Sequence, residues 1–188
     1  MTGALAHPAS PHPSAWVCRW SHLVVAGADV LDVACGSGRH VRWFTDRGCR
    51  VTALDRDTAA VEPLRSMARV VVADLEAAPW PLPGERFDAV VCTNYLWRAL
   101  LPALIDAIEE GGVLIYETFA DGNAAFGKPS NPAFLLRPGE LLEATKGLRV
   151  IAYEDGFLEA PARCVQRIVA ARDPAGGQPV RPRPLAPG

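Results

Sequence analysis

The chain has 188 residues, of which 49% are hydrophobic and 21% charged, so it can build one packed domain of ordinary size. Its formal net charge of −2 does not show the excess of basic residues that is typical of proteins that bind nucleic acid or an anionic membrane. The spacing of the five cysteines and four histidines fits neither a disulfide framework nor a metal site, so we expect reduced thiols and no metal. The sequence contains no run of about 18 apolar residues, so it predicts no membrane-spanning helix. No secretory leader is recognisable, so we expect a cytoplasmic protein.

Short β-branched runs alternate with helical patterns, which predicts an α/β fold with a parallel sheet and helices on both faces. The first five expected strands are nearly continuous apolar runs, as in strands buried on both sides. No helical pattern separates the last two, which predicts an antiparallel pair at one edge. The expected strands are residues 29–34, 50–54, 70–73, 87–92, 112–118, 148–153 and 164–171. The expected helices are residues 14–26, 39–47, 58–67, 95–109 and 139–145.

Local signals refine these expectations. Asp57 is a candidate N-cap, and Pro63 removes a backbone donor and should kink the helix that begins after the cap. The Gly111-Gly112 pair predicts a helix stop after Glu110. Trp16 and Trp20 share one helical face and are expected in the core. Proline-rich composition predicts a flexible segment at 1–13 and a disordered tail at 174–188, which leaves a domain at 14–173.

The most informative segment is 30–40, where a buried strand enters a turn containing Gly36 and Gly38 and then a helix. Glycines there let the backbone pass close beneath a bound nucleotide. A dinucleotide fingerprint needs a third glycine at position 41, which is Val41. Asp32 lies four residues before Gly36, where a carboxylate would repel a pyrophosphate but suit a ligand with an ammonium group. The turn therefore favours a cationic cofactor.

The next two strands also end in acids. Asp55 is placed to accept hydrogen bonds from a ribose diol, and Asp74 from an exocyclic amine, with Leu75 packed on an adenine face. Taken alone, Asp55 could equally begin a turn and Asp74 could equally be a loop residue, while capping of a helix is the lesser alternative for Asp32. Together with Asp32 they lie at one edge of the sheet, where ligands of open α/β sheets bind.

The segment from Asp32 to Gly38, with Asp55 and Asp74 at the following strand ends, resembles the class I S-adenosylmethionine-dependent methyltransferases over about residues 14–172. The resemblance implies a Rossmann-like doubly wound seven-stranded sheet of order 3-2-1-4-5-7-6 with strand 7 antiparallel. It also implies that Gly36 and Gly38 contact the methionine moiety, Asp55 the ribose, and Asp74 with Leu75 the adenine. Within the family, the Gly-Arg-His continuation after Ser37 and residues 117–119 look most similar to the small bacterial tellurite-resistance type. Further expected cofactor contacts are Ala34, His40, Arg56, Asn94 and Tyr95.

The acceptor is expected after the fourth and fifth strands. Residues 92–98 lack the Asn/Asp-Pro-Pro-Tyr motif of enzymes that methylate planar nitrogens, which disfavours a nucleic-acid substrate. The long segment 120–138 is expected to be a binding loop, with a solvated surface excursion as the alternative. Glu117 is the only carboxylate that we nominate as a general base. The side chains expected to face a small anionic or heteroatom-rich acceptor are Trp97, Arg98, Phe126, Lys128 and Arg137, and packing of the adjoining helix is an equal alternative for the first two.

The sequence therefore predicts a methyltransferase that uses S-adenosylmethionine on a small-molecule acceptor, as a monomer or weak homodimer. Two alternatives remain open at this point. One is a nucleotide-binding oxidoreductase, which Val41 and Asp32 disfavour. The other is a non-catalytic cofactor-binding or interaction protein, because a fold does not imply a chemistry.

Overall fold

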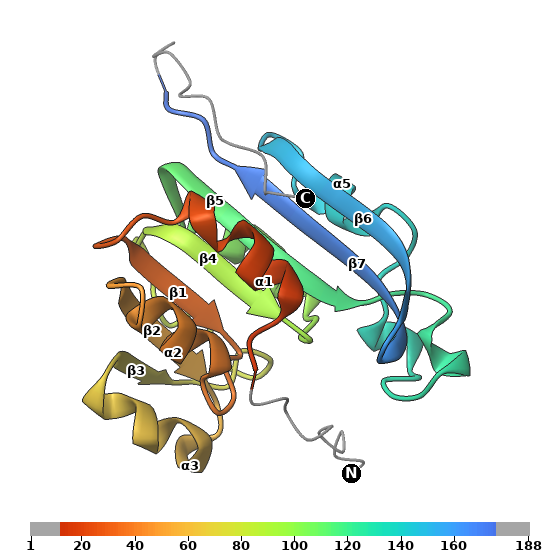
Figure 1. Cartoon of the computed structure of the whole chain (residues 1–188), viewed down its shortest axis with the longest axis horizontal. Helices are drawn as coiled ribbons and strands as arrows, with labels where there is room; N and C mark the ends of the chain where they lie inside the picture. Colours follow the sequence, from red (N-terminus) through yellow and green to blue (C-terminus); the bar gives the residue numbers. More distant parts are fainter. Residues whose placement is uncertain (1–11, 176–188) are drawn as a thin grey trace.

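The computed structural model describes residues 12–175 and contains a seven-stranded sheet of order β3-β2-β1-β4-β5-β7-β6 (Figure 1). Neighbours among the first five strands run parallel, whereas β7 is antiparallel to both β5 and β6. The order and the antiparallel edge are confirmed. The strands are β1 (Asp29–Val33), β2 (Arg50–Asp55), β3 (Arg69–Val72), β4 (Phe87–Thr93), β5 (Ile108–Phe119), β6 (Arg149–Glu159) and β7 (Ala162–Ala171).

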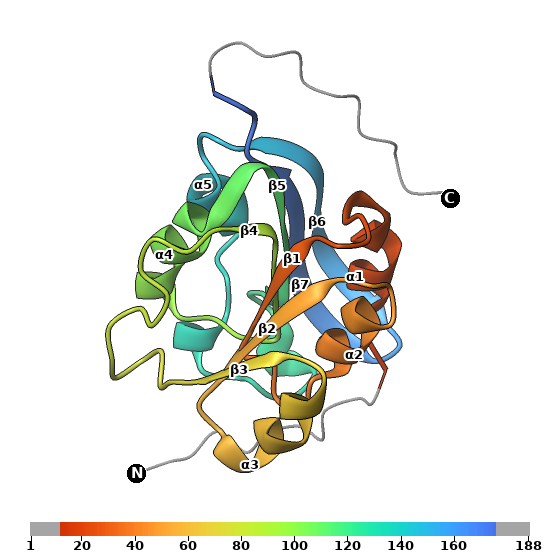
Figure 2. The ribbon, with the colours of Figure 1, turned by 90° about the vertical axis from the view of Figure 1, so that its left-hand side faces the viewer.

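Helices cover both faces of the sheet, as expected for parallel strands that are apolar on both sides. Seen from the β3 edge, α1 and α2 lie on one side of the sheet, and α4 and α5 lie on the other (Figure 2). The α-helices are α1 (Ala15–Trp20), α2 (Arg39–Thr45), α3 (Thr58–Val61), α4 (Leu101–Asp106) and α5 (Glu140–Ala144). The 3₁₀ turns are η1 (Ser21–Leu23), η2 (Glu62–Ser66), η3 (Arg98–Leu100), η4 (Asn123–Ala125) and η5 (Pro132–Phe134).

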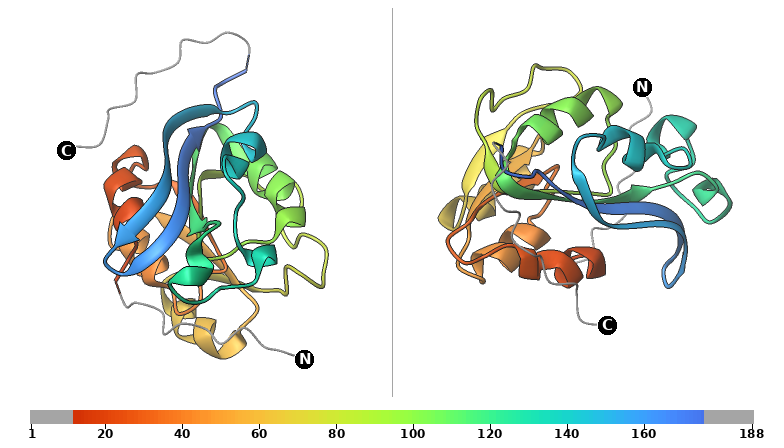
Figure 3. Two further views of the ribbon diagram at one scale, coloured as in Figure 1. Left: turned by 90° about the vertical axis from the view of Figure 1, so that its right-hand side faces the viewer. Right: turned by 90° about the horizontal axis from the view of Figure 1, so that it is seen from above.

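Each face of the sheet has its own hydrophobic core. Trp16 and Trp20 of α1 pack with Phe44 of α2 over the first face, and their burial confirms the core assignment of the two tryptophans. Leu104 of α4 and Leu141 of α5 pack over the second face. The β6–β7 hairpin forms the edge opposite β3 (Figure 3).

The predicted helix at 95–109 exists only as η3 and α4 over residues 98–106, and its predicted stop at the glycine pair is wrong. The chain is irregular up to Trp97, α4 ends at Asp106, and Gly111 and Gly112 lie inside β5. Ile108 already pairs with Phe87, and the register then shifts before Ala89. A Cβ at residue 112 would lie 2.9 Å from the Asp88 carbonyl oxygen, so the glycine permits this bulge rather than ending a helix.

The helix predicted at 58–67 divides at the proline. The Asp57 carboxylate caps α3 by accepting the Ala60 amide, and the chain continues after Val61 as η2, with Pro63 in its first turn. Most of the segments predicted to be flexible, 1–13 and 174–188, lies outside the described residues. Within residues 12–175, no helix is long and apolar enough to cross a membrane.

Candidate functional site

The turn between β1 and α2 is built on left-handed backbone. Ala34, Gly36 and Gly38 have φ values of 52°, 54° and 78°. A Cβ at Gly36 would meet no atom of the described residues within 4 Å, whereas one at Gly38 would lie 2.5 Å from the Leu64 side chain. Gly38 therefore lets the turn pack against η2, and Gly36 borders open space that a ligand can use. Ala34 adopts a backbone conformation that L-residues with a Cβ disfavour.

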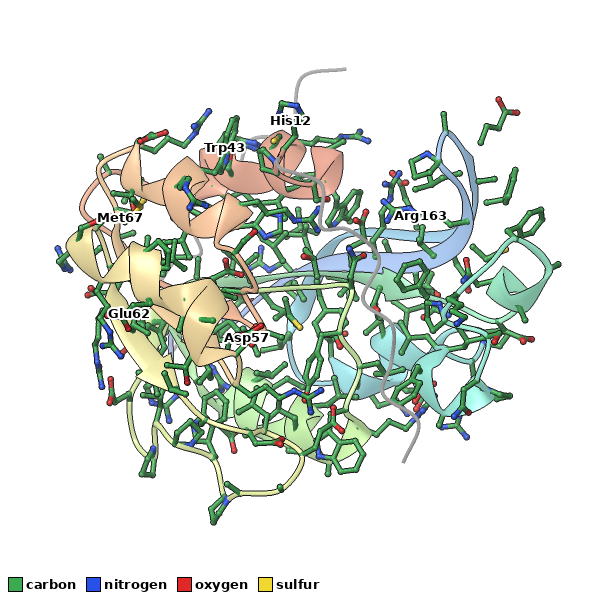
Figure 4. The ribbon with its side chains drawn as sticks, turned by 90° about the horizontal axis from the view of Figure 1, so that it is seen from below. His12, Trp43, Asp57, Glu62, Met67 and Arg163 are labelled. Atoms are coloured by element: carbon green, nitrogen blue, oxygen red, sulfur yellow. The ribbon has the colours of Figure 1, made fainter. Side chains whose placement is uncertain are left out.

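Asp55, at the end of β2, holds this turn in place. Its Oδ2 accepts the Gly36 amide at 2.7 Å, and its Oδ1 accepts the Asp57 amide at 2.9 Å. The ends of β1 and β2 are thereby joined through one half-buried carboxylate. Figure 4 looks onto this end of the sheet, with Asp57 toward the α3 side and Arg163 toward the β7 side.

Asp74 follows β3 at the same edge. Its Oδ1 accepts the Glu76 amide at 3.0 Å, and its Oδ2 lies 3.7 Å from an Arg56 guanidinium nitrogen. Leu75 is buried in the core on the second face of the sheet. The structure thus places all three strand-end acids, Asp32 included, at the carboxyl ends of adjacent strands.

Asp32 and His40 lie beneath the turn, each only 1% exposed. The His40 Nδ1 is 3.8 Å from Oδ1 of Asp32, and its Nε2 accepts the Ser14 amide at 3.1 Å. The Asp32 Oδ2 is buried and has no hydrogen-bond partner within residues 12–175. Both nitrogens of His40 therefore face protein groups, while one oxygen of Asp32 remains available.

Asn94 and Tyr95 follow β4, beside the turn. Asn94 has a positive φ of 56°, and its amide donates to the Glu117 carbonyl oxygen at 2.9 Å. The carbonyl oxygen of Tyr95 accepts the Tyr116 hydroxyl at 2.6 Å. Burial raises the pKa of the Tyr95 hydroxyl well above its usual range, with Glu76 and the Cys92 thiol adding to the effect. This hydroxyl remains a neutral donor at physiological pH.

Glu117 sits at the centre of a buried ionic cluster on β5. It is 1% exposed and accepts the Ser14 hydroxyl at 3.0 Å, Arg163 at 3.4 Å and Arg167 at 3.3 Å. Arg167 also donates to Glu154 on β6. These contacts give the carboxylate a structural role, and its role as a base stays a prediction.

Two of the residues expected to bind the acceptor, Arg98 and Arg137, meet at Glu140. Every nitrogen of the Arg98 guanidinium donates to protein oxygens, namely both carboxylate oxygens of Glu140 and the carbonyls of Ala133 and Leu135. Arg137 lies 3.4 Å from the same Glu140. Arg98 thereby clamps the segment 120–138, which contains η4 and η5 rather than being structureless.

The remaining acceptor candidates lie at the surface. Phe126 stacks on Phe157 of β6 with ring centroids 4.6 Å apart, and both rings are about half exposed. Trp97 and Lys128 are exposed, Trp97 next to η3 and Lys128 beyond η4.

Sequence reasoning missed Ser14, Arg39, Arg163 and Arg167. Arg39 donates to the Thr93 hydroxyl at 3.1 Å. Burial lowers the pKa of its guanidinium, and the carboxylates of Asp32 and Glu117 oppose that effect. The spacing of Arg163 and Arg167 on a strand places both on one face, a signal that the sequence did contain. Within residues 12–175, no group of three or more His, Cys, Asp or Glu side chains could hold a metal ion.

Comparison with known proteins identifies the domain. Residues 30–112 match the model of a family described as a methyltransferase domain. Residues 30–112 therefore carry a methyltransferase domain, in agreement with the resemblance to the class I S-adenosylmethionine-dependent methyltransferases. Malonyl-(acyl-carrier protein) O-methyltransferase of Pseudescherichia vulneris is 36% identical over 105 residues, which cover 51% of this chain and 41% of that enzyme. Ubiquinone biosynthesis O-methyltransferase of Azotobacter vinelandii is 32% identical over 124 residues, which cover 60% and 52%. The match spans about half or less of these relatives' length.

Solved structures of this class share the fold of the methyltransferase domain. TehB from Haemophilus influenzae superposes with a TM-score of 0.67 at 20% identity, covering 84% of this chain and 61% of that one. A TehB-like S-adenosylmethionine-dependent methyltransferase from Corynebacterium glutamicum gives 0.63 at 19% identity, covering 84% and 87%.

Proposed function

We propose that the protein transfers a methyl group from S-adenosylmethionine to a small-molecule acceptor. The observation that carries the proposal is the buried Oδ2 of Asp32, which has no hydrogen-bond partner among the residues that the structure describes. A buried oxygen without a donor costs about 1–3 kcal/mol, and a ligand ammonium group would supply the donor. A pyrophosphate would instead meet a buried negative charge, so the site favours this cofactor over a dinucleotide.

The strand-end acids can hold the cofactor without giving up their structural bonds. A carboxylate oxygen can accept two hydrogen bonds, so Asp55 can bind a ribose hydroxyl and keep the Gly36 amide. Asp74 and Leu75 lie one strand further along, at the position expected for adenine. The open space beside Gly36 leaves room for the methionine moiety.

The bound cofactor supplies an electrophilic methyl group on a sulfonium. The protein's task in such a displacement is to align the two reactants and exclude water, and a base is needed only for an acceptor that must lose a proton. Asn94 and Tyr95 follow β4 and would contact the cofactor, while Trp97 beyond them would face the acceptor. The O-methyltransferase relatives suggest an oxygen acceptor as the first class to test.

Calorimetric titration with S-adenosylhomocysteine, S-adenosylmethionine and NADH tests the cofactor. We expect the two adenosyl ligands to bind and NADH not to bind. Asp55→Asn removes the charge and should weaken binding of S-adenosylhomocysteine by about tenfold, the value of one charged hydrogen bond. The control is Asp57→Asn, because asparagine also caps helices and residue 57 lies just beyond the site.

Two results would overturn the proposal. Binding of NADH alone would identify a redox protein, and binding of no adenosyl ligand would favour a non-catalytic protein. Release of S-adenosylhomocysteine is then measured with carboxylates, phenols, thiols, amines and chalcogen oxyanions. Failure of every acceptor to support turnover, despite cofactor binding, would contradict the enzymatic part of the proposal.

A further inference from the structure

A buried chain of polar contacts links the N-terminus of α1 to the cofactor turn. Asp32 faces His40, His40 accepts the Ser14 amide, and the Ser14 hydroxyl donates to Glu117. Ser14, His40 and Glu117 come from three elements that are 26 to 103 residues apart in sequence. All four side chains are less than 9% exposed. Any role of these contacts in cofactor binding rests on the proposed function, because Asp32 is the residue that would bind the cofactor.

The contact with Ser14 determines which nitrogen of His40 carries the proton. A backbone amide can only donate, so the Nε2 that receives it must be unprotonated. In the neutral ring the proton is then on Nδ1, which is the nitrogen that faces Oδ1 of Asp32 at 3.8 Å. The other tautomer would turn a lone pair toward the carboxylate and leave the Ser14 amide without an acceptor.

We propose that His40 is a positioning residue for cofactor binding. The Ser14 amide holds the ring in the Nδ1–H tautomer, and this N–H, 3.8 Å from Oδ1, turns its positive end toward the Asp32 carboxylate and leaves Oδ2 for a donor on the cofactor. α1 thereby contributes to cofactor affinity through a contact that does not touch the cofactor. The order Ser–His–Asp resembles a hydrolase triad, but the Ser14 hydroxyl donates to Glu117, so it is not activated by the histidine.

The surroundings keep Ser14 in place. Its hydroxyl also caps α1 by accepting the Trp16 and Val17 amides, while Glu117 is held by Arg163 and Arg167 of β7. Ser14 is therefore fixed from both sides, by the helix that it caps and by the ion cluster below it. Because the Ser14 amide is held in place, it can select the Nδ1–H tautomer of His40.

Two substitutions of His40 test the contacts of its two ring nitrogens separately. In His40→Asn the amide nitrogen can occupy the Nδ1 position, which keeps the donor toward Asp32 and loses the acceptor for Ser14. In His40→Gln the amide oxygen can occupy the Nε2 position, which keeps the acceptor and loses the donor. We expect S-adenosylhomocysteine to bind His40→Asn within about threefold of the wild type and His40→Gln about tenfold more weakly.

The ranking of the two affinities distinguishes a positioning role of His40 from simple packing. If His40 only filled space and anchored Ser14, the glutamine variant would be the better of the two. Urea unfolding of both variants records their stability separately from their affinity. Equal affinities, or tighter binding by His40→Gln, would overturn the proposal.

A second pair of variants, with substitutions at Ser14, tests the role of the Ser14 amide itself. Ser14 has φ of −58° and ψ of 137°, which proline can adopt. Ser14→Ala removes the hydroxyl alone, whereas Ser14→Pro removes the hydroxyl and the amide hydrogen. We expect Ser14→Pro to bind S-adenosylhomocysteine about fivefold more weakly than Ser14→Ala. The difference should vanish in a His40→Asn background, because that variant no longer uses the amide.

The outcomes separate the role of His40 from the proposed function. If the wild type binds no adenosyl ligand, the proposed function fails and the positioning role with it. If the wild type binds and the two Ser14 variants have equal affinity, the positioning role alone fails. Should Ser14→Pro not fold, the comparison of the two His40 variants decides the question.

Discussion

The clamp formed by Arg98 and Glu140 makes a specific prediction about acid stability. Glu140 is 8% exposed and receives hydrogen bonds from Arg98, the Arg137 amide and the Arg137 side chain. Burial alone would raise the pKa of its carboxyl, but these bonds and the charge of Arg98 outweigh it and lower the pKa to about 2. The ordinary value is 4.5. The ionised carboxylate therefore stabilises the fold.

The sign and size of the effect follow from linkage. Because the pKa is lower in the folded state, the stabilisation is complete above the ordinary pKa and is lost as the pH falls toward the folded pKa. The difference corresponds to about 3 kcal/mol at pH 7 and about 2 kcal/mol at pH 3.5. Glu140→Gln should cost about 3 kcal/mol at neutral pH, and the cost should shrink as the solution is acidified.

Urea unfolding followed by tryptophan fluorescence at pH 7, 5 and 3.5 measures this directly. Glu143→Gln is the matched control on the same helix, because the Glu143–Lys146 pair is exposed and such pairs contribute about 0–1 kcal/mol. If the two variants lose the same free energy of unfolding at pH 7, the clamp does not stabilise the fold. A Glu140→Gln cost that stays constant with pH would refute the titration argument.

Three further substitutions test other parts of the structure. Ala34→Gly should raise the free energy of unfolding by about 0.5–1 kcal/mol in urea unfolding, because glycine relieves the positive φ at residue 34; a loss of stability would contradict this. Gly112→Ala should cost about 2 kcal/mol or more by the same measurement, since its Cβ would meet three backbone oxygens at 2.9–3.0 Å. Gly156→Ala, with no atom near its Cβ, is its control and should be close to neutral. Asp74→Asn should weaken binding of S-adenosylhomocysteine by a few fold in calorimetry, whereas unchanged affinity would remove Asp74 from the adenine site.

The sheet could be predicted because its strands carry the signal locally. The apolar runs of β1, β2 and β4 are buried on both faces and could be recognised without knowing their neighbours. The strand order came from the resemblance to a known family. The glycine pair in β5 was misinterpreted because a bulge and a helix stop use the same residue type, and only the pairing of Ile108 with Phe87 distinguishes them.

The site was predicted in part, and the division has a physical basis. The strand-end acids could be located because parallel strands end at one edge. Arg98 was assigned to the acceptor because it follows β4, but its partner Glu140 is 42 residues away and no local pattern reveals that pair. His40 was assigned to the cofactor for its place after the glycine turn, whereas its ring turns inward to Ser14 and Asp32.

The carboxylates at the cofactor edge serve the fold and the proposed ligand at once. Asp55 joins the Gly36 turn to the start of α3 through its two oxygens, so Asp55→Ala would loosen the turn as well as remove a ligand contact. A loss of affinity in the alanine variant would therefore not separate the two roles. Asparagine removes the charge and keeps one acceptor oxygen, but its amino group cannot accept the second backbone amide. Urea unfolding of Asp55→Asn is therefore measured beside its affinity, so that the loss in the turn is separated from the loss of the ligand contact. Asp32 also serves both, because its Oδ1 faces His40 while its Oδ2 has no partner in the described part of the chain.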